Sequence, residues 1–143
     1  MADEQWNWQT DRSIPSETEA GRSIEEELLR QMEAAGWGRH DRFSVRLAME
    51  EAIVNAIAHG NRYHAEKRVR VRCWLKPELV RIEVHDEGPG FDPARVPDPT
   101  DPERLQCPCG RGLMLMRHFM TRVEHLHPGS TVVLEKRRGV EGE

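Results

Sequence analysis

Two runs of alternating apolar residues constrain the fold of this chain more than any other feature. Each run places apolar side chains at every second position, the period of a β-strand, and these residues are Val69, Val71, Cys73 and Leu75, then Val80, Ile82 and Val84. The short segment 76–79 between the runs contains Pro77, which is typical of a turn. The pattern therefore predicts a β-hairpin with an apolar face that other elements have to cover.

Two amphipathic helices are predicted before this hairpin. Apolar residues recur at spacings of three and four, at Ile24, Leu28, Met32 and Ala35 in the first helix, and at Val45, Ala48, Met49, Ala52, Ile53, Ala56 and Ile57 in the second. Ser16 and Asp41 are candidate N-caps, and the second helix is expected to end at Gly60 and Asn61. A short first strand within 5–12 is also plausible, because Trp6 and Trp8 would share a face.

The second half of the chain begins with a proline-rich segment. Residues 91–109 hold five of the nine prolines, and a long loop inside a domain tends to be a binding loop or a lid. A third helix is expected to follow it, opened by Gly110 and Gly112, and then a last hairpin around Pro128 and Gly129.

This order of elements predicts an α+β fold. The helices are segregated from the strands, so we expect a two-layer α/β sandwich with one mixed, mainly antiparallel sheet covered on one face by helices. The length suits one domain, which we place over 1–143 with a lid at approximately 91–109.

Composition narrows the possible environments and partners. The net charge is −4, and the basic stretch 66–72 alternates Arg with Val like a solvated strand face, so no direct nucleic-acid binding is expected. No apolar run approaches the ~20 residues that span a bilayer, and the acidic N-terminus lacks a signal-peptide core. Three cysteines make no disulfide framework. We expect a cytoplasmic protein without a membrane segment.

The first chemical motif is "EEAIVNAIAHGN" at 50–61. Glu51, Asn55 and His59 recur every four residues and so form a polar ridge beside the apolar stripe of the second helix. Such a ridge could be an ordinary solvent face. Asn55, however, is a poor helix former in mid-helix, and its amide oxygen is a donor that suits Mg²⁺.

The second and third motifs are rich in glycine. In "VHDEGPGF" (84–91), Asp86 leaves a strand, and Gly88 and Gly90 would let a flat ligand approach the backbone. In "CGRGLMLM" (109–116), Gly110 and Gly112 open a helix whose free amides suit phosphate. Taken singly, the two motifs could equally be a turn and a helix entry.

Taken together, the three motifs resemble a known superfamily. Their order is similar to that of the ATP-binding domain shared by gyrase, the Hsp90 chaperone, histidine kinases and the MutL repair protein, which has the Bergerat-type fold. The compact length and the stretches "EEAIVNAIAHGN", "DEGPGFDP" and "GRGLMLMRHFM" resemble the bacterial anti-sigma-factor serine/threonine kinases, also called switch-protein kinases.

The resemblance implies a role for each motif residue. Glu51 would be the general base and Asn55 the ligand of the Mg²⁺ that bridges the ATP phosphates, whereas Glu50 lies off that face. Asp86 would hold the adenine amine between Gly88 and Gly90. The phosphates would be bound by residues at the start of the third helix: Gly110, Arg111, Gly112 and Leu113. The role of His59 is left open between capping the helix end and touching phosphate.

The resemblance also implies an activity and partners. The chain would be an Mg-dependent kinase that uses ATP to phosphorylate a small anti-anti-sigma antagonist of the STAS type, sequesters a sigma factor, and forms a homodimer. The stretch "LQCPCGRG" departs from the pattern, because Cys107 and Cys109 replace the Arg and Ser often found there. A lid arginine is therefore missing unless Arg104 or Arg111 substitutes. This departure leaves two alternatives open: a nucleotide-gated binding module without kinase activity and, ranked lower, the detached catalytic domain of a histidine kinase.

Overall fold

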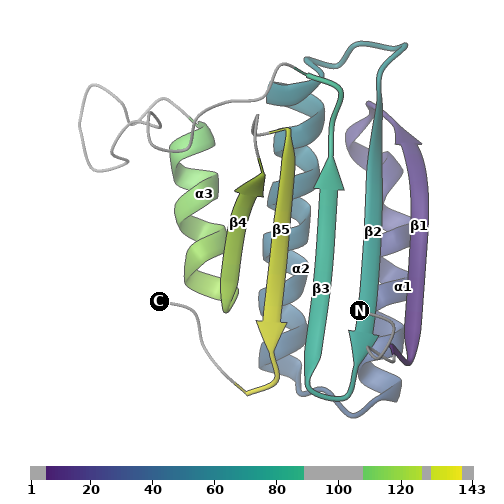
Figure 1. Cartoon of the computed structure of the whole chain (residues 1–143), viewed down its shortest axis with the longest axis vertical. Helices are drawn as coiled ribbons and strands as arrows, with labels where there is room; N and C mark the ends of the chain where they lie inside the picture. Colours follow the sequence, from purple (N-terminus) through teal and green to yellow (C-terminus); the bar gives the residue numbers. More distant parts are fainter. Residues whose placement is uncertain (1–5, 89–107, 127–129, 140–143) are drawn as a thin grey trace.

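The fold is described by a computed structural model covering residues 6–88, 108–126 and 130–139, with backbone alone for Thr18 and 108–113. The elements in chain order are β1 (Trp8–Pro15), the 3₁₀ turn η1 (Thr18–Gly21), α1 (Arg22–Ala34), α2 (Arg39–Asn55), the π-helical turn η2 (Ala56–Gly60), β2 (Arg68–Lys76), β3 (Leu79–His85), α3 (Pro108–Phe119), β4 (Arg122–Leu126) and β5 (Thr131–Arg137). Figure 1 shows the strands side by side with the helices behind them.

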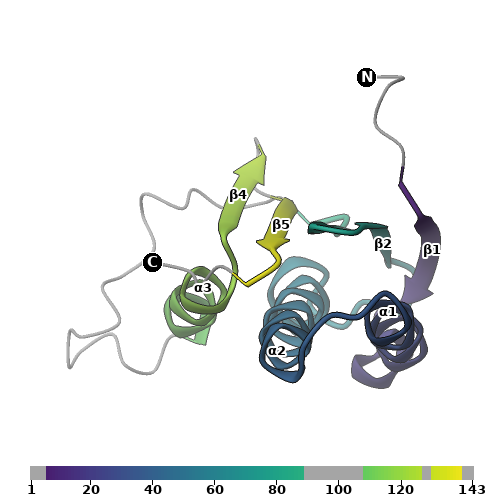
Figure 2. The ribbon, with the colours of Figure 1, turned by 90° about the horizontal axis from the view of Figure 1, so that it is seen from below.

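The strands form one sheet in the order β1-β2-β3-β5-β4, and all four pairings in the described part of the chain are antiparallel. Seen end on in Figure 2, α1, α2 and α3 all lie on the same side of this sheet. The predicted fold, an α+β two-layer sandwich with its helices on one face, is confirmed, and so are the hairpin around Pro77 and the pairing of the last two strands.

The core lies between the helices and the sheet. The alternating residues of β2 and β3 are buried there, as predicted, and they meet the buried stripes of α1 and α2. Met116 and Met120 add a contribution from α3 and the residue after it. Removing this much apolar surface from water is the main force that holds helices against sheet.

The uncovered face of the sheet is polar. Arg70 forms a bidentate pair with Asp11, at 2.9 and 2.6 Å, so the basic stretch 66–72 is a solvated strand face, as predicted. Trp74 lies on this face beneath the guanidinium of Arg72, 4.9 Å from its ring centre, and beside Trp6. Trp6 precedes β1, whereas Trp8 packs against the core, so the expectation that they share a face was wrong.

Both predicted N-caps were wrong. α1 begins at Arg22, after the 3₁₀ turn, and α2 begins at Arg39; Gly21 and Gly38 precede them without side-chain caps. The Ser16 hydroxyl instead donates to the Lys67 carbonyl at 2.6 Å, and the buried Asp41 carboxylate accepts from the Gly139 amide at 2.9 Å. Both side chains are used in long-range contacts rather than local caps.

The last two residues of the segment 91–109, which was predicted to form a lid, are helical. α3 begins at Pro108, so Pro108 and Cys109 belong to the helix. Proline suits a first helical position because its missing N–H would have no partner there. The rest of the lid, 91–107, and the turn at 128 and 129 lie outside the described residues. Within those that are described, no helix has the length and apolarity needed to cross a bilayer.

Candidate nucleotide-binding site

The polar ridge of the second helix forms at a change of helix type. α2 ends at Asn55, and the next five residues make a π-helical turn in which the Asn61 amide donates to the Ala56 carbonyl at 2.8 Å. Sequence patterning predicted an unbroken α-helix to Gly60. Single π-helical turns are found frequently at functional sites, and this one places His59 past the point where α-helical spacing holds.

Glu51, Asn55 and His59 are nevertheless neighbours. Burial raises the pKa of the Glu51 carboxyl, while the charge of His59 and a hydrogen bond with the Asn55 side chain act to lower it. Glu51 is only half-buried, so one side stays open to a reacting group. A half-buried carboxylate with a raised pKa is a better proton acceptor than an exposed one at neutral pH.

Asp86 lies where β3 ends, packed against the end of the π-helical turn. A Cβ placed on Gly60 would lie 2.3 Å from the Asp86 carboxyl carbon, and one on Gly88 would lie 2.1 Å from the Gly60 carbonyl oxygen. Real atoms do not approach so closely, so glycine is required at both positions. The requirement at Gly60 was not predicted, because it comes from a contact between residues 26 positions apart.

The Asp86 carboxylate is buried, and burial raises its pKa. The backbone amide of Gly88 donates to Asp86 Oδ1 at 2.8 Å, and this bond, with the charges of His85 and Lys67, acts to lower the pKa. The hydrogen bond also fixes one oxygen of the Asp86 carboxylate.

Asn61 is the functional candidate that sequence reasoning missed. Its side chain is 1% exposed and links three parts of the chain. Nδ2 donates to the Ser16 hydroxyl and to the Arg68 carbonyl, both at 3.0 Å, and Oδ1 accepts from the Glu87 amide at 2.7 Å. The one available signal was an asparagine after the helix-ending glycine, which is equally typical of a C-terminal cap.

The third motif lies in the first turns of α3. Gly110, Arg111, Gly112 and Leu113 belong to this helix, as expected, but the helix begins at Pro108, two residues earlier than the expected start at Gly110. The side chains of Arg111 and Leu113, together with Gly90, lie outside the described residues. α3 packs against α2, the helix that carries Glu51 and Asn55.

The donor set near Asn55 fits a magnesium ion that is held mainly by phosphate. Among the residues whose side chains are described, no three His, Cys, Asp or Glu gather in a cluster of the kind that would cage a metal. Mg²⁺ is usually held by one or two protein oxygens plus phosphate and water, so one half-exposed carboxamide beside Glu51 is compatible with that mode of binding.

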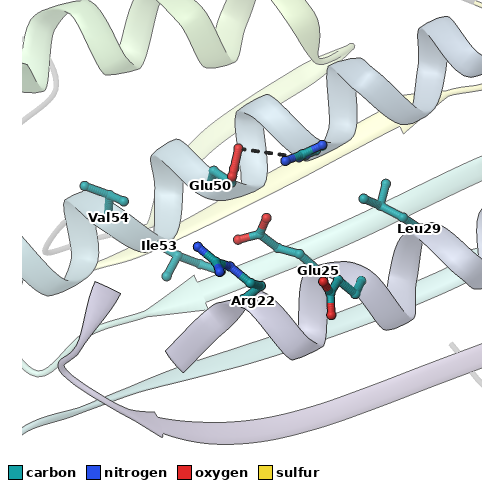
Figure 3. Close-up of a pocket in the computed structure, with 8 residues that line it drawn as sticks. Arg22, Glu25, Leu29, Glu50, Ile53 and Val54 are labelled. Atoms are coloured by element: carbon teal, nitrogen blue, oxygen red, sulfur yellow. Dashed lines mark ion pairs between the residues drawn. The ribbon is translucent and has the colours of Figure 1, made fainter. Parts of the chain in front are cut away.

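A hollow lies between α1 and α2, and Figure 3 shows the residues that line it. Its volume is about 270 Å³, and Glu25 of α1 and Glu50 of α2 both point into it. Glu50 pairs with Arg46 at 3.8 Å. Glu50 therefore belongs to a different site from Glu51, as the sequence predicted.

Comparison with known proteins identifies the family. A model of the histidine kinase-like ATPase domain matches residues 14–136 of this chain. The chain belongs to this family. Membership of an ATPase family implies ATP binding, which agrees with Asp86 and Gly88 after β3 packed against Gly60, at the end of the π-helical turn that follows Glu51 and Asn55.

Several curated anti-sigma factors are similar to this chain in sequence. Anti-sigma F factors of Bacillus thuringiensis, Bacillus cereus and Bacillus anthracis are each 34% identical over 98 residues. The match covers 64% of this chain and 66% of each relative, so it spans just under two thirds of their length.

A solved structure supports the fold. The chain is similar to the crystal structure of the RsbU and RsbW domains of a Mycobacterium tuberculosis protein, with a TM-score of 0.61 and 16% identity. The similarity covers 92% of this chain and 32% of that one.

Proposed function

We propose that this chain is an ATP-dependent, Mg²⁺-dependent protein serine/threonine kinase that acts as an anti-sigma factor. It phosphorylates a small anti-anti-sigma antagonist of the STAS type and sequesters a sigma factor, and it works as a homodimer in the cytoplasm. The names of the Bacillus relatives support the regulatory role. The observation that carries the kinase role is the half-buried Glu51 carboxyl, with its raised pKa, one turn before Asn55.

ATP binding would use residues from all three motifs. Asp86 accepts a hydrogen bond from the adenine amine, with Gly88 and Gly90 leaving room for the ring. Asn55 offers its amide oxygen to Mg²⁺, which supplies charge neutralisation on the phosphates when bound. The phosphates would be bound at the start of α3, by Gly110, Arg111, Gly112 and Leu113, where the helix dipole favours negative charge.

The transfer step asks little covalent chemistry of the protein. A serine or threonine hydroxyl oxygen of the antagonist bonds to the γ-phosphorus, the bond from that phosphorus to the β–γ bridging oxygen breaks, and ADP leaves. Glu51 accepts the hydroxyl proton. Its raised pKa matches this task, because a base that holds the proton more firmly draws it away more readily. Asn55 holds Glu51 in place by the hydrogen bond between their side chains.

Glu51→Gln is the direct test. We expect it to lower the rate of antagonist phosphorylation by about 10²–10⁴-fold while changing ATP affinity only a few-fold, because the amide keeps the shape but takes no proton. Purified full-length protein, Mg-ATP and the antagonist encoded beside it would be mixed, and phosphoserine or phosphothreonine measured by mass spectrometry.

Glu50→Gln is the matched control. Glu50 is the adjacent residue, yet it faces Arg46 in the hollow between α1 and α2, so its variant should phosphorylate the antagonist within about twofold of wild type. ATP binding without phosphorylation by wild type would replace the kinase by a nucleotide-gated binding module. Equal losses in the two variants would remove Glu51 as the base.

A further inference from the structure

We propose that Asn61 is a positioning residue that sets base selectivity, by holding the Asp86–Gly88 turn at the end of the π-helical turn. This inference rests on the proposed function, because it concerns how the same site selects adenine. Asn61 is not one of the residues expected to touch nucleotide. It acts through the Glu87 backbone, between Asp86 and Gly88.

Asn61 forms one of the hydrogen bonds that connect the turn to the rest of the fold; in two others the Arg68 amide donates to a Glu87 carboxylate oxygen at 2.5 Å and the Asp86 amide donates to the Ser130 carbonyl at 2.9 Å. Asn61 Oδ1 accepts from the Glu87 amide at 2.7 Å, while its Nδ2 is anchored by Ser16 Oγ and the Arg68 carbonyl oxygen at 3.0 Å each. Ser16 follows β1, Arg68 is the first residue of β2, and Glu87 follows β3. Asn61 is 1% exposed, and hydrogen bonds at both its amide nitrogen and its amide oxygen fix the orientation of its side chain. The side chain therefore fixes the position of the Glu87 backbone as well as filling space.

The turn formed by Asp86, Glu87 and Gly88 is conformationally restricted. The Gly88 amide donates to Asp86 Oδ1, so the carboxylate moves with the backbone on both sides of Glu87. Gly60, the residue before Asn61, is so close to Asp86 that a methyl group would not fit between them. The Glu87 amide is therefore held by the Asn61 side chain, while Asp86 packs against the Gly60 backbone. Both contacts restrict the direction in which the Asp86 carboxylate points.

The chemistry of the position explains why asparagine is needed. The site requires two donated bonds and one accepted bond from a single short side chain, and an amide supplies both kinds. Leucine has the same branching at Cγ, with two methyl groups in place of the amide oxygen and nitrogen, and supplies no hydrogen bond. An Asn61→Leu variant would release the Glu87 amide while keeping the core filled.

The test compares two nucleotides that differ only at the adenine amine. Calorimetric titration with Mg²⁺ measures the affinity of full-length protein for ATP and for purine riboside triphosphate, which lacks the 6-amino group. Wild type should prefer ATP. In Asn61→Leu this preference should fall about tenfold or more, the worth of one well-placed hydrogen bond, and affinity for the amine-free analogue should stay within about threefold.

Two further variants separate positioning from stability. Ser16→Ala removes one anchor but keeps the bond from Glu87 to Asn61, so its preference for ATP should stay within about threefold of wild type. Asn61→Ala, titrated in the same way, carries the same expectation as Asn61→Leu if leucine does not fold there. Thermal unfolding sets a temperature at which every variant compared is folded.

The outcomes of this test are distinct. Wild type that binds neither nucleotide, or binds both equally, would overturn the proposed adenine site itself. Wild type that prefers ATP, with Asn61 variants that keep the preference or weaken both nucleotides equally, would overturn only the positioning role. A selective loss of the amine-dependent affinity supports it, since a general loss of stability would not distinguish two ligands of the same shape.

Discussion

Replacing Glu25 by glutamine should stabilise the protein at neutral and higher pH. Glu25 faces Glu50 across the hollow between α1 and α2 (Figure 3). Burial, and then the negative charge of Glu50, raise the pKa of Glu25 from 4.5 to about 7, although Arg46 and Arg22 act to lower it. Folding therefore forces an unfavourable charge into this hollow whenever Glu25 is ionised.

The size of the effect follows from the two pKa values. At about 1.4 kcal/mol per pH unit, the change from 4.5 to about 7 corresponds to roughly 3 kcal/mol for a fully desolvated group. Glu25 is only half-buried, so solvent screening reduces this to about 1–2 kcal/mol. The folded state holds the proton more tightly than the unfolded state. Its extra stability is thus complete below pH 4.5 and is lost as pH rises through about 7.

Urea unfolding of wild type and Glu25→Gln between pH 4 and 8.5 measures this difference. The variants should be similar at pH 4, and glutamine should be more stable by about 1–2 kcal/mol at pH 8. Glu33→Gln, at an exposed position in the same helix that lies outside the hollow, is the control and should show no such trend. A stability difference between Glu25→Gln and wild type that is independent of pH, or that shrinks as pH rises, would refute this reasoning.

Three further changes test contacts that the structure describes. Gly60→Ala should lower ATP affinity about tenfold or more and lower the melting temperature, because its methyl group would lie 2.3 Å from the carboxyl group at the end of β3; Gly38→Ala, which meets nothing within 4 Å, should change stability by less than about 0.5 kcal/mol. Asp41→Ala should lower the free energy of unfolding in urea by about 3–5 kcal/mol, more than Lys136→Met does. The variant removes the carboxylate that lies 3.8 Å from the ammonium group of Lys136, whose side chain is only 1% exposed. Burial raises the pKa of Cys73 to about 12, so with the other two cysteines replaced by serine the folded protein should resist a thiol reagent at pH 8 and react once urea unfolds it; fast labelling of the folded protein would contradict its burial.

Local patterns predicted the fold well. Apolar residues alternate in β2 and β3 and recur at spacings of three and four in α1 and α2. These periods indicate directly which side chains are buried, because one face of each element packs against the core. Once the apolar faces were known, the order of helices and strands left few ways to cover the sheet. The positions of Glu51 and Asp86 followed from the same patterns.

Contacts between distant residues could not be predicted in this way. Ser16 and Asp41 have the residue types of helix caps, but each bonds to a residue 51 or 98 positions away. The three partners of Asn61 come from separate strand ends, and no periodicity records them. The shared hollow of Glu25 and Glu50 depends on how two helices lie against each other. The sequence therefore predicts the individual residues of the candidate site, whereas the hydrogen bonds that connect them to distant residues are visible only in the structure.

The π-helical turn at Ala56–Gly60 also affects how this protein tolerates changes in length. Each of its hydrogen bonds joins residues five positions apart rather than four. The turn therefore contains one residue more than an α-helical turn, although Gly60 lies where an α-helical turn would place it. Loss of a residue inside α2 would rotate every later side chain by about 100° and separate Asn55 from its surroundings. Loss of one residue from the wide turn would instead let the helix run on as α and arrive at Gly60 in nearly the same place. Natural or engineered deletions of one residue should thus be tolerated best immediately after Asn55, where the π-helical turn contains one residue more than an α-helical turn.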